Sequence, residues 1–76
     1  MTAPFDTKTI TVNGEVREVP VGYALTEVLR DLDVDPDYAT GVAVAVNNEV
    51  IPREAWGDVT LEAEDTVEVI QAQQGG

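Results

Sequence analysis

Hydrophobic and polar residues alternate along the first part of the chain, and this period of two predicts strands. β-Branched residues recur at positions 9–12 and 15–19, on either side of an Asn-Gly pair that readily adopts positive φ. The pattern therefore predicts a β-hairpin. A two-residue loop would set Arg17 opposite Ile10. This mismatch favours a longer, bulged turn, with the two-residue loop as the alternative.

The period changes to that of a helix between Ala24 and Leu32. Apolar residues there recur at i, i+3, i+4 and i+7, which places one face of a helix against a core: Leu25, Val28, Leu29 and Leu32. Glu27 is placed to accept a hydrogen bond from the Ala24 N–H, half of a capping box. Pro36 disfavours the α region at the preceding residue, so the helix ends before it.

The second half of the chain returns to strand patterns. Valine and alanine alternate at 42–46, so the valines share one face and the alanines the other. A short strand at 49–51 stops at a proline, and 52–57 forms one irregular or 3₁₀ turn anchored by Trp56. In the last strand, 66–71, the alternation turns Val67 and Val69 inward. It places Ile70 on the exposed face with Ala43 or Ala45.

A hairpin, a crossover helix and further strands predict an α+β fold of the β-grasp, or ubiquitin-like, type. We expect a mixed sheet of four to five strands with one main helix packed on one face. Residues 1–71 form this domain, and residues 72–76 form a flexible C-terminal tail ending in Gly-Gly.

Composition narrows the function. The chain has 15 acidic and 4 basic residues among 76, a net charge of −11, which opposes binding to nucleic acid or anionic membrane. This charge either steers the protein to a partner with a basic face or is a solubility adaptation to a salty cytoplasm. Without cysteine or histidine, the chain lacks a thiolate nucleophile and the usual general base, and we expect no metal site. No apolar run reaches the roughly 20 residues of a membrane span, so we expect a soluble cytoplasmic protein.

Three stretches of the chain form a recognisable set: the run from Gly41 to Trp56, which contains Val-Asn-Asn-x-x-x-Pro-Arg-x-x-Trp, the Val-Asn-Gly at 12–14, and the terminal Gly75-Gly76. Together they resemble the ThiS family of ubiquitin-like sulfur carriers. Two features depart from the family. Ala24 stands where relatives often have a capping Ser or Thr, and residues 72–74, before the glycines, are more polar than is usual.

The resemblance implies a reaction at the carboxylate of Gly76. A ThiF-like adenylyltransferase, related to the ubiquitin-activating enzymes, uses ATP to adenylate this group. A persulfide sulfur donor then gives a thiocarboxylate, and a ThiG-like thiazole synthase uses its sulfur for the thiazole of thiamin. The chain is then a protein cosubstrate and not an enzyme, with no stably bound cofactor.

The residues themselves fit such chemistry. A free α-carboxylate is ionised at neutral pH and is a poor acyl donor, so a partner that holds ATP must activate it. The chain has no phosphate-binding loop of its own. Gly75 has no Cβ and lets the tail thread a narrow channel to present Gly76, which we expect to need no proteolytic processing because it is the last residue.

Two further residues are candidates for partner binding. Ile70 lies beside the tail on the exposed face and is predicted to belong to a docking patch. Arg53 either pairs with a nearby acid on the surface or contacts a partner, whereas Trp56 is interpreted as a core residue.

Three other functions stay open from the sequence. They are a MoaD-like small subunit of molybdopterin synthase, a ubiquitin-like protein modifier, and an acidic binding module on the same scaffold.

Overall fold

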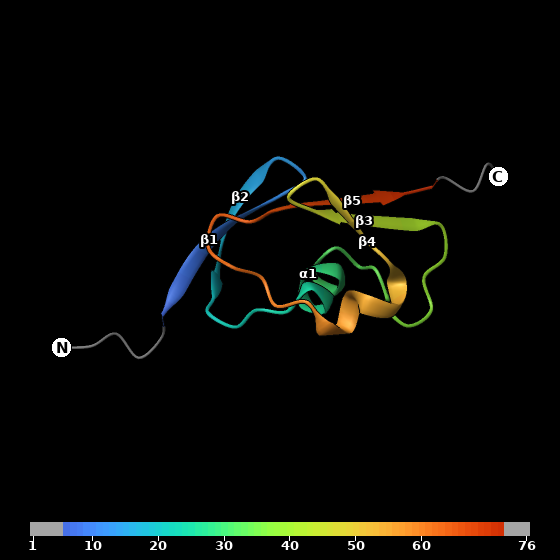
Figure 1. The fold of residues 1–76 in the computed structure, drawn as a ribbon, viewed down its shortest axis with the longest axis horizontal. Helices are drawn as coiled ribbons and strands as arrows, with labels where there is room; N and C mark the ends of the chain where they lie inside the picture. The colour runs from blue at the N-terminus through green and yellow to red at the C-terminus, as the bar shows by residue number, and fades with distance from the viewer. Residues whose placement is uncertain (1–5, 73–76) are drawn as a thin grey trace.

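A computed structural model describes residues 6–72, which form a five-stranded sheet with helices on one side (Figure 1). The elements in chain order are β1 (Thr7–Val12), β2 (Glu15–Pro20), α1 (Leu25–Asp31), β3 (Val42–Val46), β4 (Glu49–Ile51), the 3₁₀ helix η1 (Arg53–Asp58) and β5 (Thr66–Gln71). The strand order is β2-β1-β5-β3-β4. β1 and β5 run parallel, and the other neighbours are antiparallel. The predicted α+β, β-grasp arrangement is confirmed.

The β1–β2 hairpin corrects one expectation from the sequence. Its loop has two residues, Asn13 with φ 50° and Gly14 with φ 84°, and is not a longer, bulged turn. Ile10 therefore does lie opposite Arg17. This pairing is tolerated because β2 is an edge strand, where the Arg17 side chain stays 32% exposed and reaches Glu15 at 3.5 Å.

The core lies between the sheet and the two helices. Each strand except β4 contributes at least one buried residue, which packs with one face of α1, and Leu61 and Trp56 complete the layer. Trp56 is 3% exposed, which confirms its interpretation as a core residue. Fully burying an apolar side chain of this kind contributes about 1.5–3 kcal/mol, so this layer is the main stabilising feature.

The ends of α1 follow from local hydrogen bonds. The Glu27 carboxylate accepts a hydrogen bond from the Ala24 N–H at 3.0 Å, as the sequence predicted. At the other end, Val34 N–H donates to the Leu29 carbonyl at 2.8 Å, with Asp33 at φ 62°. This left-handed residue reverses the chain. The chain then continues through residues 35–41 to the start of β3.

Among residues 6–72, no helix is long and apolar enough to cross a membrane.

Candidate functional site

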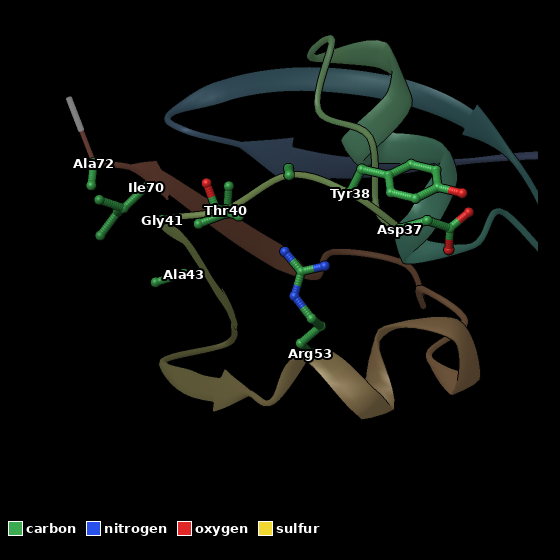
Figure 2. Close-up of a pocket in the computed structure, with 10 residues that line it drawn as sticks. Asp37, Tyr38, Thr40, Gly41, Ala43, Arg53, Ile70 and Ala72 are labelled. Carbon is green, nitrogen blue, oxygen red and sulfur yellow. The ribbon is translucent and has the colours of Figure 1, made fainter. Parts of the chain in front are cut away.

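A groove lies where β5 ends, between the loop that precedes β3 and the start of η1 (Figure 2). Its walls come from three separate parts of the chain: Asp37, Tyr38, Ala39, Thr40, Gly41, Val42, Ala43, Arg53, Ile70 and Ala72. Both residues predicted to bind a partner, Ile70 and Arg53, therefore line one groove. Ala72, the last described residue, lines it too, so the groove adjoins the start of the tail.

Arg53 is fixed by two neighbours, neither of which is a carboxylate. Its Nη1 donates to the Pro36 carbonyl at 3.1 Å, and its Cζ lies 4.8 Å from the centroid of the Trp56 ring. The indole in turn donates from Nε1 to the Ile51 carbonyl at 2.9 Å. Within the described ranges, the one ion pair joins Arg17 to Glu15. Arg53 therefore does not form the surface ion pair with a nearby acid that was one of its two predicted roles. Its predicted contact with a partner stays a prediction.

This environment holds the guanidinium at the groove while leaving it accessible. A cation–π contact in which the cation stays exposed contributes about 0.5–1 kcal/mol. In Figure 2 the Arg53 side chain extends from η1 toward the loop that carries Thr40. The side chain is exposed, so its remaining N–H groups can bind a carbonyl or carboxylate of another molecule.

Ile70 belongs to an apolar patch on the face of the sheet away from α1. Its side chain is 65% exposed and it pairs with Ala43, as strand alternation predicted. Ala45 lies on the same face, and its partner in β4 is Val50, 72% exposed. We call Ala43, Ala45, Val50 and Ile70 the apolar patch. Its role in partner binding stays a prediction.

Sequence reasoning missed Val50, although a signal for it was present. Asn47 and Asn48 have φ values of 53° and 69°, the conformation of a two-residue hairpin turn. This turn sets Val50 opposite Ala45, and hence on the same face. A two-residue turn at Asn47-Asn48, assumed from the sequence, would have predicted that the patch includes Val50 of the next strand.

The loop before β3 was missed as well. Tyr38 in this loop is 82% exposed and lines the groove with Thr40 and Gly41. The loop conformation is stabilised by the Asp35 carboxylate, which accepts a hydrogen bond from the Asp37 N–H at 2.8 Å. No periodic pattern in this segment indicates that it borders the end of β5.

Gly75 and Gly76, the predicted reacting end of the chain, lie outside the described residues, so their predicted roles stay predictions. In the part of the chain that the structure does describe, no polar or charged side chain is buried. Nor does any group of three or more acidic side chains lie close enough there to hold a metal ion. What residues 6–72 present next to the tail is the groove and the apolar patch.

Comparison with known proteins gives one consistent result. The ThiS family model matches residues 10–76. The sulfur carrier protein ThiS of Escherichia coli strain K12 is 28% identical over 67 residues, which cover 88% of this chain and 97% of that protein. A crystal structure of the thiamine biosynthesis protein ThiS from Geobacter metallireducens is similar with a TM-score of 0.70 and 36% identity, over 90% of this chain and 99% of that one.

A solution structure of a thiamine biosynthesis protein from the same organism has a TM-score of 0.68 and 35% identity, over 90% of this chain and 87% of that one. Sequence and fold thus agree over nearly the whole length on both sides. The chain belongs to the ThiS family.

Proposed function

We propose that this protein is a sulfur carrier of thiamin biosynthesis whose Gly76 carboxylate is converted to a thiocarboxylate. The observation that carries the proposal is the extent of the family match, which runs through residue 76 and so includes the terminal Gly75-Gly76. The fold supports it, because β5 lies in the middle of the sheet and leads directly into the tail. The protein acts as a cosubstrate, and its partner enzymes supply ATP binding and catalysis.

The reaction proceeds in balanced steps. A carboxylate oxygen of Gly76 attacks the α-phosphorus of ATP on a ThiF-like adenylyltransferase, which releases pyrophosphate and gives an acyl-adenylate. The terminal sulfur of a persulfide attacks the acyl carbon, AMP leaves, and an acyl disulfide forms. A thiol then cleaves this disulfide by exchange and releases the thiocarboxylate. A ThiG-like thiazole synthase accepts the sulfur.

The apolar patch and the groove are the surfaces on which we place the adenylyltransferase. Ile70 and Val50 are the patch residues with large exposed apolar side chains, and interface energy concentrates in a few such residues. Arg53 at the groove offers donors for a partner carbonyl or carboxylate. The net charge of −11 favours a partner whose surrounding surface is basic.

The test is a mass measurement. Incubated with ATP, the adenylyltransferase, a persulfide donor and a thiol, the protein should gain the mass of one sulfur replacing one oxygen. Fragmentation should map the change to Gly76. Deleting Gly76 should abolish conversion, because the new carboxylate is displaced by more than 3 Å, and about 1 Å of misplacement already costs about 10²-fold.

Two controls complete the experiment. Conversion should stop without ATP, because nothing in this chain activates an ionised carboxylate. Gly76→Ala should leave the thermal midpoint unchanged. It should slow conversion, because the added Cβ clashes with the narrow channel of the partner enzyme. Sulfur on an internal residue, or full conversion of the chain lacking Gly76, would overturn the proposal.

A further inference from the structure

Gly41, the residue before β3, makes the hydrogen bond of the sheet that lies nearest the C-terminus within residues 6–72. Its carbonyl accepts from the Ala72 N–H at 2.7 Å, one residue beyond the last pair of the β3–β5 ladder, Val42 with Gln71. Gly41 has φ 68°, a left-handed conformation that a glycine adopts without strain. Figure 2 shows Gly41 at the end of the groove where Ile70 and Ala72 lie.

The approach of the two strands at this point also leaves little space for a side chain. A Cβ at position 41 would lie 3.2 Å from the Cβ of Ala72, tighter than ordinary van der Waals contact. Conformation and space therefore both favour glycine at this position. By contrast, Gly22 has φ 89° but no atom within 4 Å of the corresponding Cβ position, so it has the conformational requirement alone.

On the other side of β5, the hydrogen bonds from β1 and its turn end before Ile70. β1 pairs with β5 at Thr66 and Val67, and the Asn13 side chain extends this support by accepting from the Val69 N–H at 2.8 Å. Past Val69, the described strand β5 pairs with β3 alone. Among the described residues, the bond from Ala72 to Gly41 is thus the contact of this strand nearest the C-terminus.

We infer that Gly41 is a positioning residue for the reaction at the C-terminus: it anchors Ala72 and so sets the reach and direction of the reacting tail. This inference rests on the proposed function. Four residues follow Ala72, and at 3.3–3.6 Å each they place Gly76 at most about 14 Å from the anchor. A partner docked on the apolar patch must hold its reacting groups within that distance.

Releasing the anchor changes this geometry. Hydrogen-bonded and non-hydrogen-bonded pairs alternate along an antiparallel ladder, so the next hydrogen-bonded pair after Ala72 with Gly41 is Ile70 with Ala43. From Ile70 six residues remain to the end of the chain, a reach of about 20 Å. The longer unanchored segment lowers the effective concentration of the carboxylate roughly twofold. A shift of the reacting carbon by a fraction of an ångström slows the chemical step further, so that the total loss in rate reaches up to about tenfold.

The test compares two variants with a matched control. Gly41→Ala combines the unfavourable φ with the 3.2 Å contact, and Ala72→Pro removes the donated N–H without touching Gly41. Gly22→Ala supplies the same kind of backbone strain far from the tail. We expect both anchor variants to lower kcat for thiocarboxylate formation about two- to tenfold with KM unchanged, and Gly22→Ala to keep the wild-type kcat.

A second measurement does not depend on turnover. In hydrogen exchange, the Ala72 amide should be protected in the wild type and in Gly22→Ala, and should lose protection in Gly41→Ala. An unprotected wild-type Ala72, wild-type kcat in both anchor variants, or an equal loss of kcat in Gly22→Ala would overturn the inference. If the wild type forms no thiocarboxylate, the proposed function fails, while the exchange data still decide whether the anchor exists.

Discussion

At the scale of single residues, the fold changes the acidity of Tyr23. Its hydroxyl donates to the Asp31 carboxylate and so joins the segment before α1 to the last residue of that helix. This hydrogen bond, and to a smaller extent partial burial, raises the pKa of Tyr23 from 10.0 to about 12. The protonated hydroxyl is therefore favoured more strongly in the folded protein than in the unfolded chain.

This shift predicts a loss of stability at high pH. As pH rises above 10.0, the unfolded chain releases the Tyr23 proton first, so the free energy of unfolding falls until the folded pKa of about 12 is reached. Denaturant titrations across this range should show a steeper decline for the wild type than for Tyr23→Phe. Tyr38→Phe, which removes an exposed hydroxyl, is the matched control and should keep the wild-type slope. Parallel curves for wild type and Tyr23→Phe would contradict the prediction.

At the scale of elements, the sequence predicted each strand and helix, because their periodicities are local. It misjudged the register of the first hairpin. The Asn-Gly pair favoured the two-residue turn, but the polar Arg17 opposite the buried Ile10 argued against it. That conflict disappears once β2 is known to be an edge strand, and strand order is a tertiary property that no local pattern contains.

The residues of the groove and of the apolar patch also differ in how far the sequence predicts them. Ile70 followed from alternation within one strand, and Val50 could have followed from one turn. The contact of Gly41 with Ala72 could not, because it joins two segments that are far apart in the sequence. Before the fold is known, Gly41 is only a glycine that precedes a strand.

The apolar patch gives a prediction at this scale. Ile70→Glu should leave the thermal midpoint nearly unchanged, because the side chain is 65% exposed, and should weaken binding to the adenylyltransferase by about 2 kcal/mol or more. Val16→Glu is the matched control. Val16 is 73% exposed, lies in β2 and is not part of the patch. Titration calorimetry with the partner measures the binding of both variants.

Two outcomes would contradict this prediction. Equal weakening by both substitutions would show that added negative charge, and not the loss of the apolar contact, reduces binding. Unchanged binding of Ile70→Glu would remove the patch from the interface.

At the scale of the whole molecule, the acidic side chains have few internal partners. The chain carries 15 carboxylate side chains and 4 basic side chains, and residues 6–72 contain one ion pair, Arg17 with Glu15. Two of the basic groups bind carbonyl oxygens instead. Lys8 donates to Leu61, and Arg53 donates to Pro36. A net charge of −11 on so small a body therefore remains largely uncompensated, and self-repulsion opposes the folded state.

Added salt should consequently stabilise the protein. Screening shortens the reach of charge repulsion to about 10 Å at 0.1 M and about 3 Å at 1 M, and the folded state gains more than the expanded unfolded chain because its charges lie closer together. Relief of about 1 kcal/mol would raise the thermal midpoint by roughly 4–8 °C for a domain of this size. KCl is the suitable salt, because its direct effect on apolar burial is small, and calorimetry at low and moderate concentrations gives the midpoint. The single exposed ion pair is weakened by the same screening, but such a pair contributes only about 0–1 kcal/mol, so the net effect stays positive. A midpoint that is flat or falls as KCl is added would show that self-repulsion does not limit the stability of this fold.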